Sequence, residues 1–148
     1  MQIGVPKESS PGERLVSATP KTVKQLVGLG YDVVVEAGAG AQASYPDADY
    51  EEAGARVVGT DEVWLADLIT KVRAPSPDEV QRLQPNQTFA SLMQPAQNPD
   101  LLQSLADKQV TALAMDAVPR ISRAQALDVL SSQANLAGYR AVIEAAHE

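Results

Sequence analysis

The 148-residue sequence contains no cysteine and a single histidine, His147, one residue before its end. On this chain alone, disulfides, thiol nucleophiles and thiolate metal sites are therefore excluded. A multi-histidine metal site and an internal Ser-His-Asp triad are excluded too. No run of about 20 apolar residues is present, so no segment is predicted to span a membrane. The absence of cysteine is typical of proteins from a reducing compartment.

Basic residues are also scarce. The chain has 12 Lys and Arg against 19 Asp and Glu, which gives a net charge of −7. Non-specific nucleic-acid binding needs clustered cations, so we expect no nucleic-acid partner. The acidic residues are dispersed and form no acidic tail. With 45% hydrophobic and 21% charged residues, the sequence is typical of one globular domain.

Six short and nearly all-apolar runs alternate with helix signals. Such runs are typical of strands that are covered on both faces. The alternation predicts an α/β fold, a flavodoxin-like or Rossmann-like parallel sheet with flanking helices. The expected strands are Gln2–Val5, Asp32–Glu36, Ala55–Val58, Leu68–Val72, Thr88–Met93 and Val110–Met115.

Capping residues mark where helices begin. Thr19 precedes Pro20, which predicts an N-cap followed by proline at the first helical position, and Gly30 supplies the stop. Ser76 and Glu79 have the spacing of a capping box. Further helix starts are expected at Asn98–Pro99 and at Ser122–Gln125.

The C-terminal segment 131–148 is predicted to be one helix, with 1–130 forming the α/β core. It contains no proline and only one glycine, Gly138, and no stop signal ends it. Arg140 and Glu144 form an i,i+4 pair worth about 0.3 kcal/mol. Small residues recur at helical spacing, at Ala134, Ala137, Gly138, Ala141 and Ala145. We infer that the helix connects to further protein beyond Glu148, and that this chain is a front part.

The segment Gly38–Ala43 fits a loose G-x-G-x-x-G/A dinucleotide fingerprint after a predicted strand. In that fingerprint the loop opens directly into a helix whose N-terminus faces the pyrophosphate. Here Pro46 would break such a helix, which favours a start at Pro46 or Asp47. A structural turn is therefore favoured over direct phosphate contact.

The segment after the last predicted strand concentrates polar side chains where α/β folds usually bind ligands. If residues 124–132 are helical, Gln125, Asp128 and Ser132 share one face, with Arg120 and Arg123 near its start. A cation, an amide and a carboxylate can then converge.

A purely structural interpretation of this segment stays open. Gln125 can complete a capping box with Ser122, and Asp128 can pair with Arg123 or favour the helix N-terminus. A third candidate site is the pair Arg14 and Lys71. Both residues could reach one sheet edge and hold a carboxylate or phosphate, or they could be solvated surface cations.

Several segments together carry a family resemblance. The sequence resembles the alanine dehydrogenase and nicotinamide nucleotide transhydrogenase family over its whole length, and within it the α subunit of proton-translocating transhydrogenases. The opening of the family is matched by Gly4–Glu8, Arg14–Pro20 and Glu36–Gly40. The α subunit is matched by Pro95–Pro99, Met115–Gln125 and Asn135–Ala141.

The resemblance implies an enzyme that passes a hydride between NAD(H) and NADP(H), coupled to proton translocation. This chain would be the first of two subdomains of the NAD(H)-binding component, and a Rossmann domain with the GxGxxG site would follow Glu148. Further implied partners are an NADP(H)-binding β subunit, a membrane domain and a second copy in a homodimer. The complex would lie at the cytoplasmic face of the inner membrane, with this segment itself soluble.

The family's loop at the nicotinamide half of NAD(H) maps onto Arg120, Gln125, Asp128 and Ser131. The serine differs from the helical-face prediction, Ser132, and an irregular backbone would reconcile the two.

Two other functions stay open. Arg14 and Lys71 match the residues that hold the substrate carboxylate in alanine dehydrogenases, but Met93-Gln94 stands where those enzymes have a catalytic histidine. The isolated chain could also be only a packing or assembly module. We expect it to be inactive alone.

Overall fold

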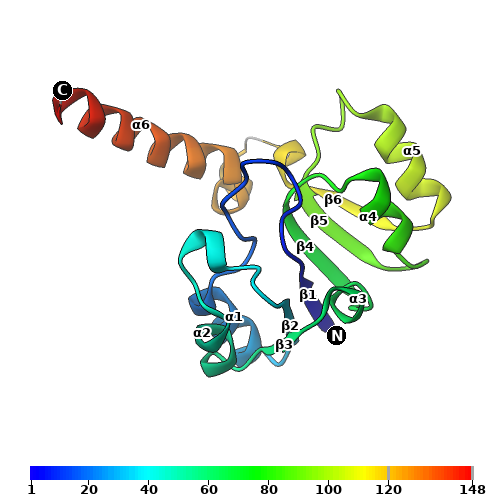
Figure 1. Cartoon of the computed structure of the whole chain (residues 1–148). Helices are drawn as coiled ribbons and strands as arrows, with labels where there is room; N and C mark the ends of the chain where they lie inside the picture. The colour runs from blue at the N-terminus through cyan, green and yellow to red at the C-terminus, as the bar shows by residue number, and fades with distance from the viewer. Residues whose placement is uncertain (120, 148) are drawn as a thin grey trace.

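A computed structural model describes residues 1–119 and 121–147. Its centre is a six-stranded sheet in the order β3-β2-β1-β4-β5-β6, with every neighbouring pair parallel (Figure 1). This order is that of a Rossmann-like sheet, which distinguishes it from the flavodoxin-like order. The predicted α/β fold with a parallel sheet is confirmed.

All six predicted strands exist, and each boundary lies within one residue of the prediction. They are β1 (Gln2–Val5), β2 (Asp32–Glu36), β3 (Arg56–Val58), β4 (Leu68–Arg73), β5 (Thr88–Leu92) and β6 (Thr111–Ala114). The α-helices are α1 (Pro20–Gly28), α2 (Asp47–Glu52), α3 (Thr60–Val63), α4 (Pro77–Arg82), α5 (Pro99–Asp107) and α6 (Val129–His147). Short 3₁₀ turns are η1 (Ala41–Ala43), η2 (Met115–Ala117) and η3 (Ser122–Leu127).

Two of the predicted caps form as expected. The Thr19 side chain accepts the N–H of Thr22 at the start of α1, and Gly30 has a φ of +90° just after that helix. At α4, the Ser76 hydroxyl accepts the N–H of Glu79 while the Glu79 carboxylate accepts the N–H of Ser76. These local signals place α1 and α4 in the chain without any tertiary information.

The helix α5 begins at Pro99 as expected, but Asn98 does not cap it with its side chain. Its amide Nδ2 instead donates to the Met93 carbonyl at 2.9 Å. Asn98 thus ties the start of α5 to the end of β5.

The sheet is covered on its two faces by different helices. On one face, α1 and α2 pack against β1, β2 and β3 around Val23, Val33, Val35 and Tyr50. On the other face, α3, α4 and α5 pack around Ile69, Phe89 and Leu105. Trp64 belongs to the same cluster and stacks on Phe89. The carboxyl ends of all six strands meet at one edge, where parallel sheets bind ligands.

The loop Gly38–Ala43 is a structural turn, as favoured from its sequence. It contains η1 in place of a long helix, and α2 begins only at Asp47. The N–H of Gly38, which has a φ of +75°, donates to the Asp47 carboxylate at 2.8 Å. The Asp47 carboxylate thus occupies a backbone N–H group that a bound phosphate would need.

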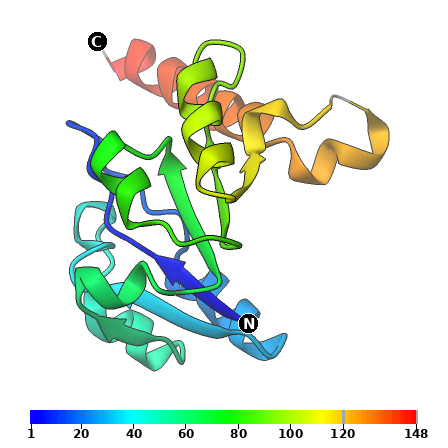
Figure 2. The same ribbon diagram turned by 90° about the vertical axis from the view of Figure 1, so that its right-hand side faces the viewer.

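The helix α6 begins at Val129, two residues earlier than predicted, and extends away from the sheet (Figures 1 and 2). Arg140 and Glu144 form the expected ion pair on it. Among the described residues, no helix combines the length and the apolar character needed to cross a bilayer.

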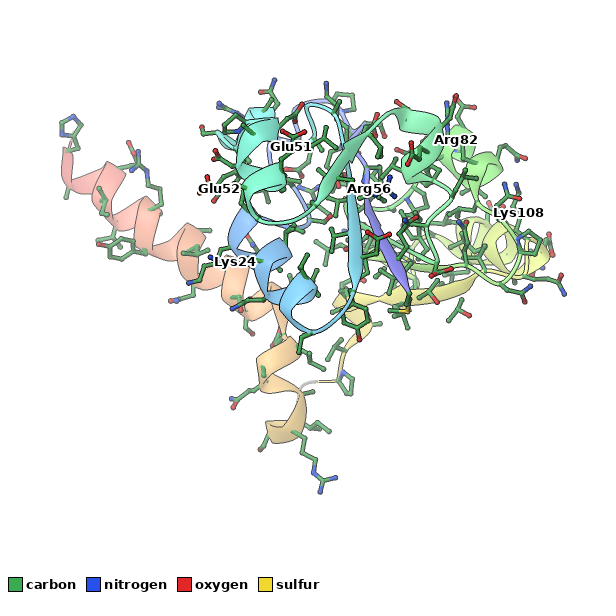
Figure 3. The ribbon with its side chains drawn as sticks, turned by 90° about the horizontal axis from the view of Figure 1, so that it is seen from below. Lys24, Glu51, Glu52, Arg56, Arg82 and Lys108 are labelled. Carbon is green, nitrogen blue, oxygen red and sulfur yellow. The ribbon has the colours of Figure 1, made fainter. Side chains whose placement is uncertain are left out.

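Surface charges are spread over many elements, as the sequence predicts (Figure 3). Arg56 contacts Glu62 at 2.9 Å, and Arg82 contacts Asp61 at 2.8 Å. Lys108 donates to a backbone carbonyl. These cations are individually partnered and do not form a basic patch.

Candidate functional site

Two clefts border the start of α6. The larger, here called the β4–β5 cleft, has a volume of about 640 Å³ and lies between the ends of these strands, the loop before α1 and the start of α6. The smaller, here called the η3 cleft, has a volume of about 370 Å³. Its lining residues are Pro119, Ile121, Ser122, Ala124, Gln125, Asp128 and Ser131.

The η3 cleft brings together three of the four residues that the family resemblance selected. Gln125 comes from η3, Asp128 from the break between η3 and α6, and Ser131 from the first turn of α6. Gln125 and Ser131 are exposed and Asp128 is half-buried. Arg120 lies outside the described residues.

Asp128 organises this cleft. Its φ of −77° and ψ of 84° interrupt the helical path, and its carboxylate accepts the N–H of Ser131 at 2.9 Å and the hydroxyl of Ser131 at 2.6 Å. These are the contacts of an N-cap residue, and they satisfy a backbone donor that helix formation leaves free. The negative charge is also favourable at a helix N-terminus.

The regular helix over 124–132 and the capping box at Ser122 are wrong predictions. Residues 122–127 form a 3₁₀ turn, preceded by Ile121 without a side-chain cap. The cap is made at Asp128 instead, because α6 starts there. Because the backbone leaves the α-helical path at this point, a helical period of 3.6 residues does not apply across residues 124–132.

That irregularity decides between the two candidate serines. The Ser132 hydroxyl donates to the backbone carbonyl of Asp128 at 3.1 Å, and Ser132 does not line the cleft. Ser131 lines it and is bonded to Asp128. The motif match located the serine of the cleft, whereas the helical-face count missed it by one residue.

Sequence reasoning missed the residue that anchors this segment to the sheet. The Asp116 carboxylate accepts the N–H of Met93 at 3.1 Å and the N–H of Gln94 at 2.6 Å. It therefore joins η2 to the end of β5. The sequence carries no local signal for these bonds, because the two N–H groups lie 23 and 22 residues away from Asp116 in the chain.

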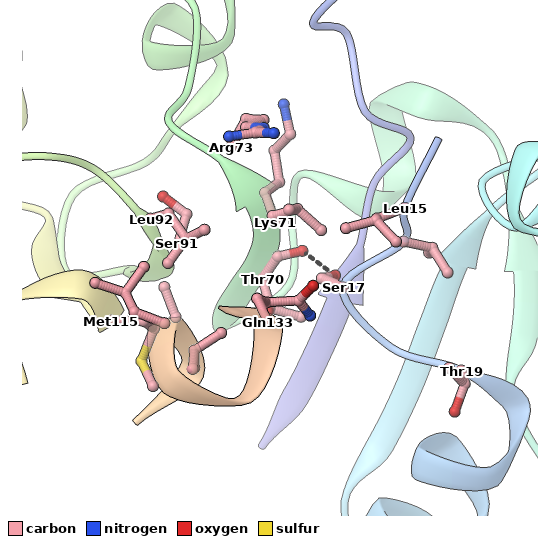
Figure 4. Close-up of a pocket in the computed structure, with 15 residues that line it drawn as sticks. Leu15, Ser17, Thr19, Thr70, Lys71, Arg73, Ser91, Leu92, Met115 and Gln133 are labelled. Atoms are coloured by element: carbon pink, nitrogen blue, oxygen red, sulfur yellow. Dashed lines mark hydrogen bonds between the residues drawn. The ribbon is translucent and has the colours of Figure 1, made fainter. Parts of the chain in front are cut away.

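The β4–β5 cleft is mostly apolar, and Figure 4 shows its lining. Leu15 of the loop before α1 faces Leu92 and Met115 across it. The Ser17 hydroxyl donates to the Thr70 carbonyl at 2.7 Å and holds the loop to β4.

Lys71 also lines this cleft, but its ammonium group is already paired. The side chain is 0% exposed, and Nζ lies 2.7 Å from Glu79 Oε1 and 3.7 Å from Glu8 Oε2. Ser9 Oγ lies 3.5 Å away. Arg14, the other predicted anion contact, is exposed and does not line the cleft, although the next residue, Leu15, does. Joint anion binding by Arg14 and Lys71 therefore stays a prediction.

The acidic groups at this edge have shifted pKa values of opposite sign. Burial raises the pKa of Glu8, against the effect of the Val72 and Arg73 N–H groups and of Lys71. For Glu13, burial acts in the same direction, but the Leu15 N–H and Arg73 outweigh it and lower the pKa. Arg73 Nε lies 2.6 Å from Glu13 Oε2.

Curated relatives match the chain over its full length. It is 53% identical over 148 residues to "NAD(P) transhydrogenase subunit alpha" of Haemophilus influenzae, of which it covers 29%. It is 38% identical over 149 residues to "Alanine dehydrogenase" of Halomonas elongata, covering 99% of this chain and 40% of that protein. The chain thus spans less than half the length of these relatives.

Solved structures and a family model lead to the same family. The transhydrogenase of Sinorhizobium meliloti is 47% identical with a TM-score of 0.94, over 100% of this chain and 45% of its own. An L-alanine dehydrogenase is 35% identical with a TM-score of 0.77, over 80% of this chain and 33% of its own. The family described as "Alanine dehydrogenase/PNT, N-terminal domain" matches residues 4–137. The chain belongs to this family.

Proposed function

We propose that this chain is the N-terminal part of an NAD(P) transhydrogenase α subunit and that its η3 cleft contacts the nicotinamide half of NAD(H). The observation that carries the proposal is the meeting of Gln125, Asp128 and Ser131 in one cleft. The higher identity to transhydrogenase subunits than to alanine dehydrogenases supports the same choice.

The donors and acceptors of the cleft fit a nicotinamide carboxamide and its ribose. The Gln125 amide can both donate and accept, and the Asp128 carboxylate only accepts. Because the Ser131 hydroxyl donates its proton to Asp128, its oxygen is left to accept from a ligand. The cleft can therefore receive the NH₂ of a carboxamide or a ribose hydroxyl and donate to the carboxamide oxygen.

These residues would act by positioning. When bound, the dihydronicotinamide supplies the hydride, and no proton moves at the reacting carbons. Rate then depends on holding the ring at a near-attack distance of about 3–3.5 Å. Asp128 and Ser131 are fixed to each other, and Asp116 anchors the preceding segment to the sheet. Such a pre-ordered cleft loses little entropy when a ring binds.

The remaining parts of the activity belong to protein outside this chain. We propose a following Rossmann domain that completes the NAD(H) site, and a β subunit that binds NADP(H). We further propose a membrane domain for proton translocation, assembly as a homodimer, and a location at the cytoplasmic face of the inner membrane. The share of the H. influenzae relative that this chain covers, 29%, leaves room for these parts.

An alanine dehydrogenase activity is the second candidate, supported by Lys71 in the β4–β5 cleft and by the relative from Halomonas elongata. Oxidation of an amine requires removal of a proton. Gln94 follows β5 where the resemblance would place a histidine, and the chain's His147 lies at the far end of α6. With pyruvate and ammonium both saturating, the intact protein should therefore oxidise no NADH; NADH oxidation that depends on both substrates would favour this second function.

Hydride transfer by the complete enzyme tests the first function. Gln125→Ala, Asp128→Ala and Arg120→Ala should each slow transfer about tenfold or more, because misplacement of a reacting ring is costly. Asp128→Asn keeps an N-cap while removing the charge, which separates helix capping from ligand contact.

Ser132→Ala is the matched control, since Ser132 lies beside Ser131 but outside the cleft. It should leave transfer unchanged. Wild-type rates in both Gln125→Ala and Asp128→Ala would reject the proposed contact.

A further inference from the structure

The segment between the last strand and the η3 cleft leaves the sheet. β6 stands last in the strand order and pairs with β5, so it lies at an edge of the sheet. Among the described residues from Ala117 to Leu127, the backbone N–H groups that donate do so within the segment. The Ile121 N–H donates to the Pro119 carbonyl and the Ala124 N–H to the Ile121 carbonyl, each at 2.9 Å. These local bonds shape the segment but do not fix its place on the sheet.

Asp116 fixes that place. It lies in η2, directly after β6, and its two carboxylate oxygens accept the N–H groups of Met93 and Gln94 at 3.1 and 2.6 Å. Both residues follow β5, which ends at Leu92. Hydrogen bonds to an ionised acceptor are about twice as strong as those between neutral groups. Within the described part of the chain, Asp116 is the last residue before the η3 cleft whose side chain bonds to the end of a strand.

The turn that receives Asp116 has an unusual conformation. Gln94 has a φ of +48°, which lies in the left-handed region and is uncommon for a residue other than glycine. Such a conformation persists only where neighbouring groups fix it. Here the Asp116 carboxylate accepts the N–H of Gln94, and the Asn98 amide donates to the carbonyls of Met93 and Gln94 at 2.9 and 3.3 Å. Two separate elements, η2 and the start of α5, therefore hold the same turn.

The start of α6 depends on the same anchor. Met115, which precedes Asp116, lines the β4–β5 cleft together with Val129 of α6. The elements η2 and α6 are in contact. Asp128 then caps α6 by accepting a backbone N–H of its first turn. The η3 cleft thus lies between two carboxylates, of which Asp116 ties the segment to the sheet and Asp128 shapes its far end.

We propose that Asp116 is a positioning residue for the nicotinamide ring. It acts without touching the cofactor: by holding η2 on the end of β5, it sets where Gln125 and Asp128 stand relative to the sheet. The inference rests on the proposed function of the η3 cleft. A displacement of about 1 Å at a reacting group can cost about hundredfold in rate. Loss of the anchor should therefore slow hydride transfer, while the remaining contacts of the cofactor still hold NADH.

The rate of hydride transfer by the complete enzyme tests the proposal. Asp116→Ala removes both acceptors of the turn. At saturating NADH, transfer should slow about tenfold or more, and the KM for NADH should change less than about threefold, since ring position is lost and cofactor binding is not. Asp116→Asn keeps the shape of the side chain and one acceptor oxygen, so it should slow transfer less. This milder variant carries the test if Asp116→Ala folds poorly.

Gln87→Ala is the matched control, because Gln87 makes a similar tether at the opposite end of β5. Its amide Nε2 donates to the carbonyls of Trp64 and Ala66, both at 2.8 Å. Gln87→Ala and Asp116→Ala should both lower the free energy of unfolding in urea, because each variant leaves two backbone groups without their partner. Only the Asp116 variant should slow hydride transfer.

Gln125→Ala, measured in parallel, separates this inference from the proposed function. Wild-type transfer in the Asp116 variants, together with slow transfer in Gln125→Ala, would overturn the positioning role and leave the proposed function intact. Wild-type transfer in both Gln125→Ala and Asp128→Ala would overturn the proposed function and this inference with it. Equal slowing by Gln87→Ala, or a raised KM for NADH at an unchanged maximal rate, would also overturn the positioning role.

Discussion

Replacing Lys71 by methionine should destabilise the protein strongly. The Lys71 side chain is 0% exposed, and its partners Glu79 and Glu8 have side chains that are 11% and 4% exposed. Removing one partner from a buried ion pair leaves an uncompensated charge and costs about 3–5 kcal/mol. In a domain of this size, such a loss lowers Tm by about 10 °C or more.

Urea unfolding of the wild type and Lys71→Met measures this loss directly. Arg82→Met is the matched control, because the Arg82–Asp61 pair is exposed at 44% and 97%. An exposed pair contributes about 0–1 kcal/mol, so the control should change the free energy of unfolding little. The double variant Lys71→Met/Glu79→Gln should regain part of the loss, since it removes one of the two unpaired carboxylates.

The pH dependence of this loss of stability provides a second test. Burial already raises the pKa of Glu8. Without Lys71, Glu8 can escape its unpaired charge by binding a proton, so the destabilisation by Lys71→Met should shrink as the pH falls toward 5. A loss below about 1 kcal/mol, equal to that of Arg82→Met and independent of pH, would refute the reasoning.

Three further predictions concern the turn at Gly40, the ion pair of Glu13 and the isolated chain. Gly40→Ala should cost about 1–3 kcal/mol or more in urea unfolding, because a Cβ there would lie 2.6 Å from the Tyr45 carbonyl oxygen. Gly28→Ala is the control. It has open space around it and should be neutral or stabilising. Glu13 has a lowered pKa, so its contribution to stability should be present above its ordinary pKa of 4.5 and lost as the pH falls through its pKa in the folded protein. Arg73→Met should weaken this pH dependence of stability. An unchanged pH profile in that variant would contradict the prediction. Calorimetry should find weak or undetectable NADH binding by the isolated 148-residue chain, and submicromolar affinity would show that this chain suffices for the cofactor.

Much of the fold follows from local signals in the sequence. The runs around Val33–Val35 and Phe89 are short and apolar, and Thr19 and Ser76 carry cap chemistry that acts within a few residues. Strand order is different, because it depends on how crossovers pass over the sheet. The sequence therefore predicted parallel strands, but the placement of β4 beside β1 emerged only from the structure.

For the candidate site, too, the sequence predicts one part and not another. Its residues could be selected from motifs, but their arrangement depends on a backbone break at Asp128 that no propensity predicts. Lys71 was identified as a cation near the sheet edge. Its burial between Glu8 and Glu79 could not be predicted, because the two carboxylates come from distant segments that meet only when the sheet forms.

The proposed function requires that Gln125, Asp128 and Ser131 contact the nicotinamide end of NAD(H). A crystal structure of the full-length polypeptide with NADH bound tests it most directly. We expect the carboxamide or the adjoining ribose to lie within hydrogen-bonding distance, about 2.7–3.2 Å, of at least two of these side chains. A nicotinamide ring bound elsewhere, with the three side chains still gathered in the η3 cleft and touching no part of the cofactor, would contradict it.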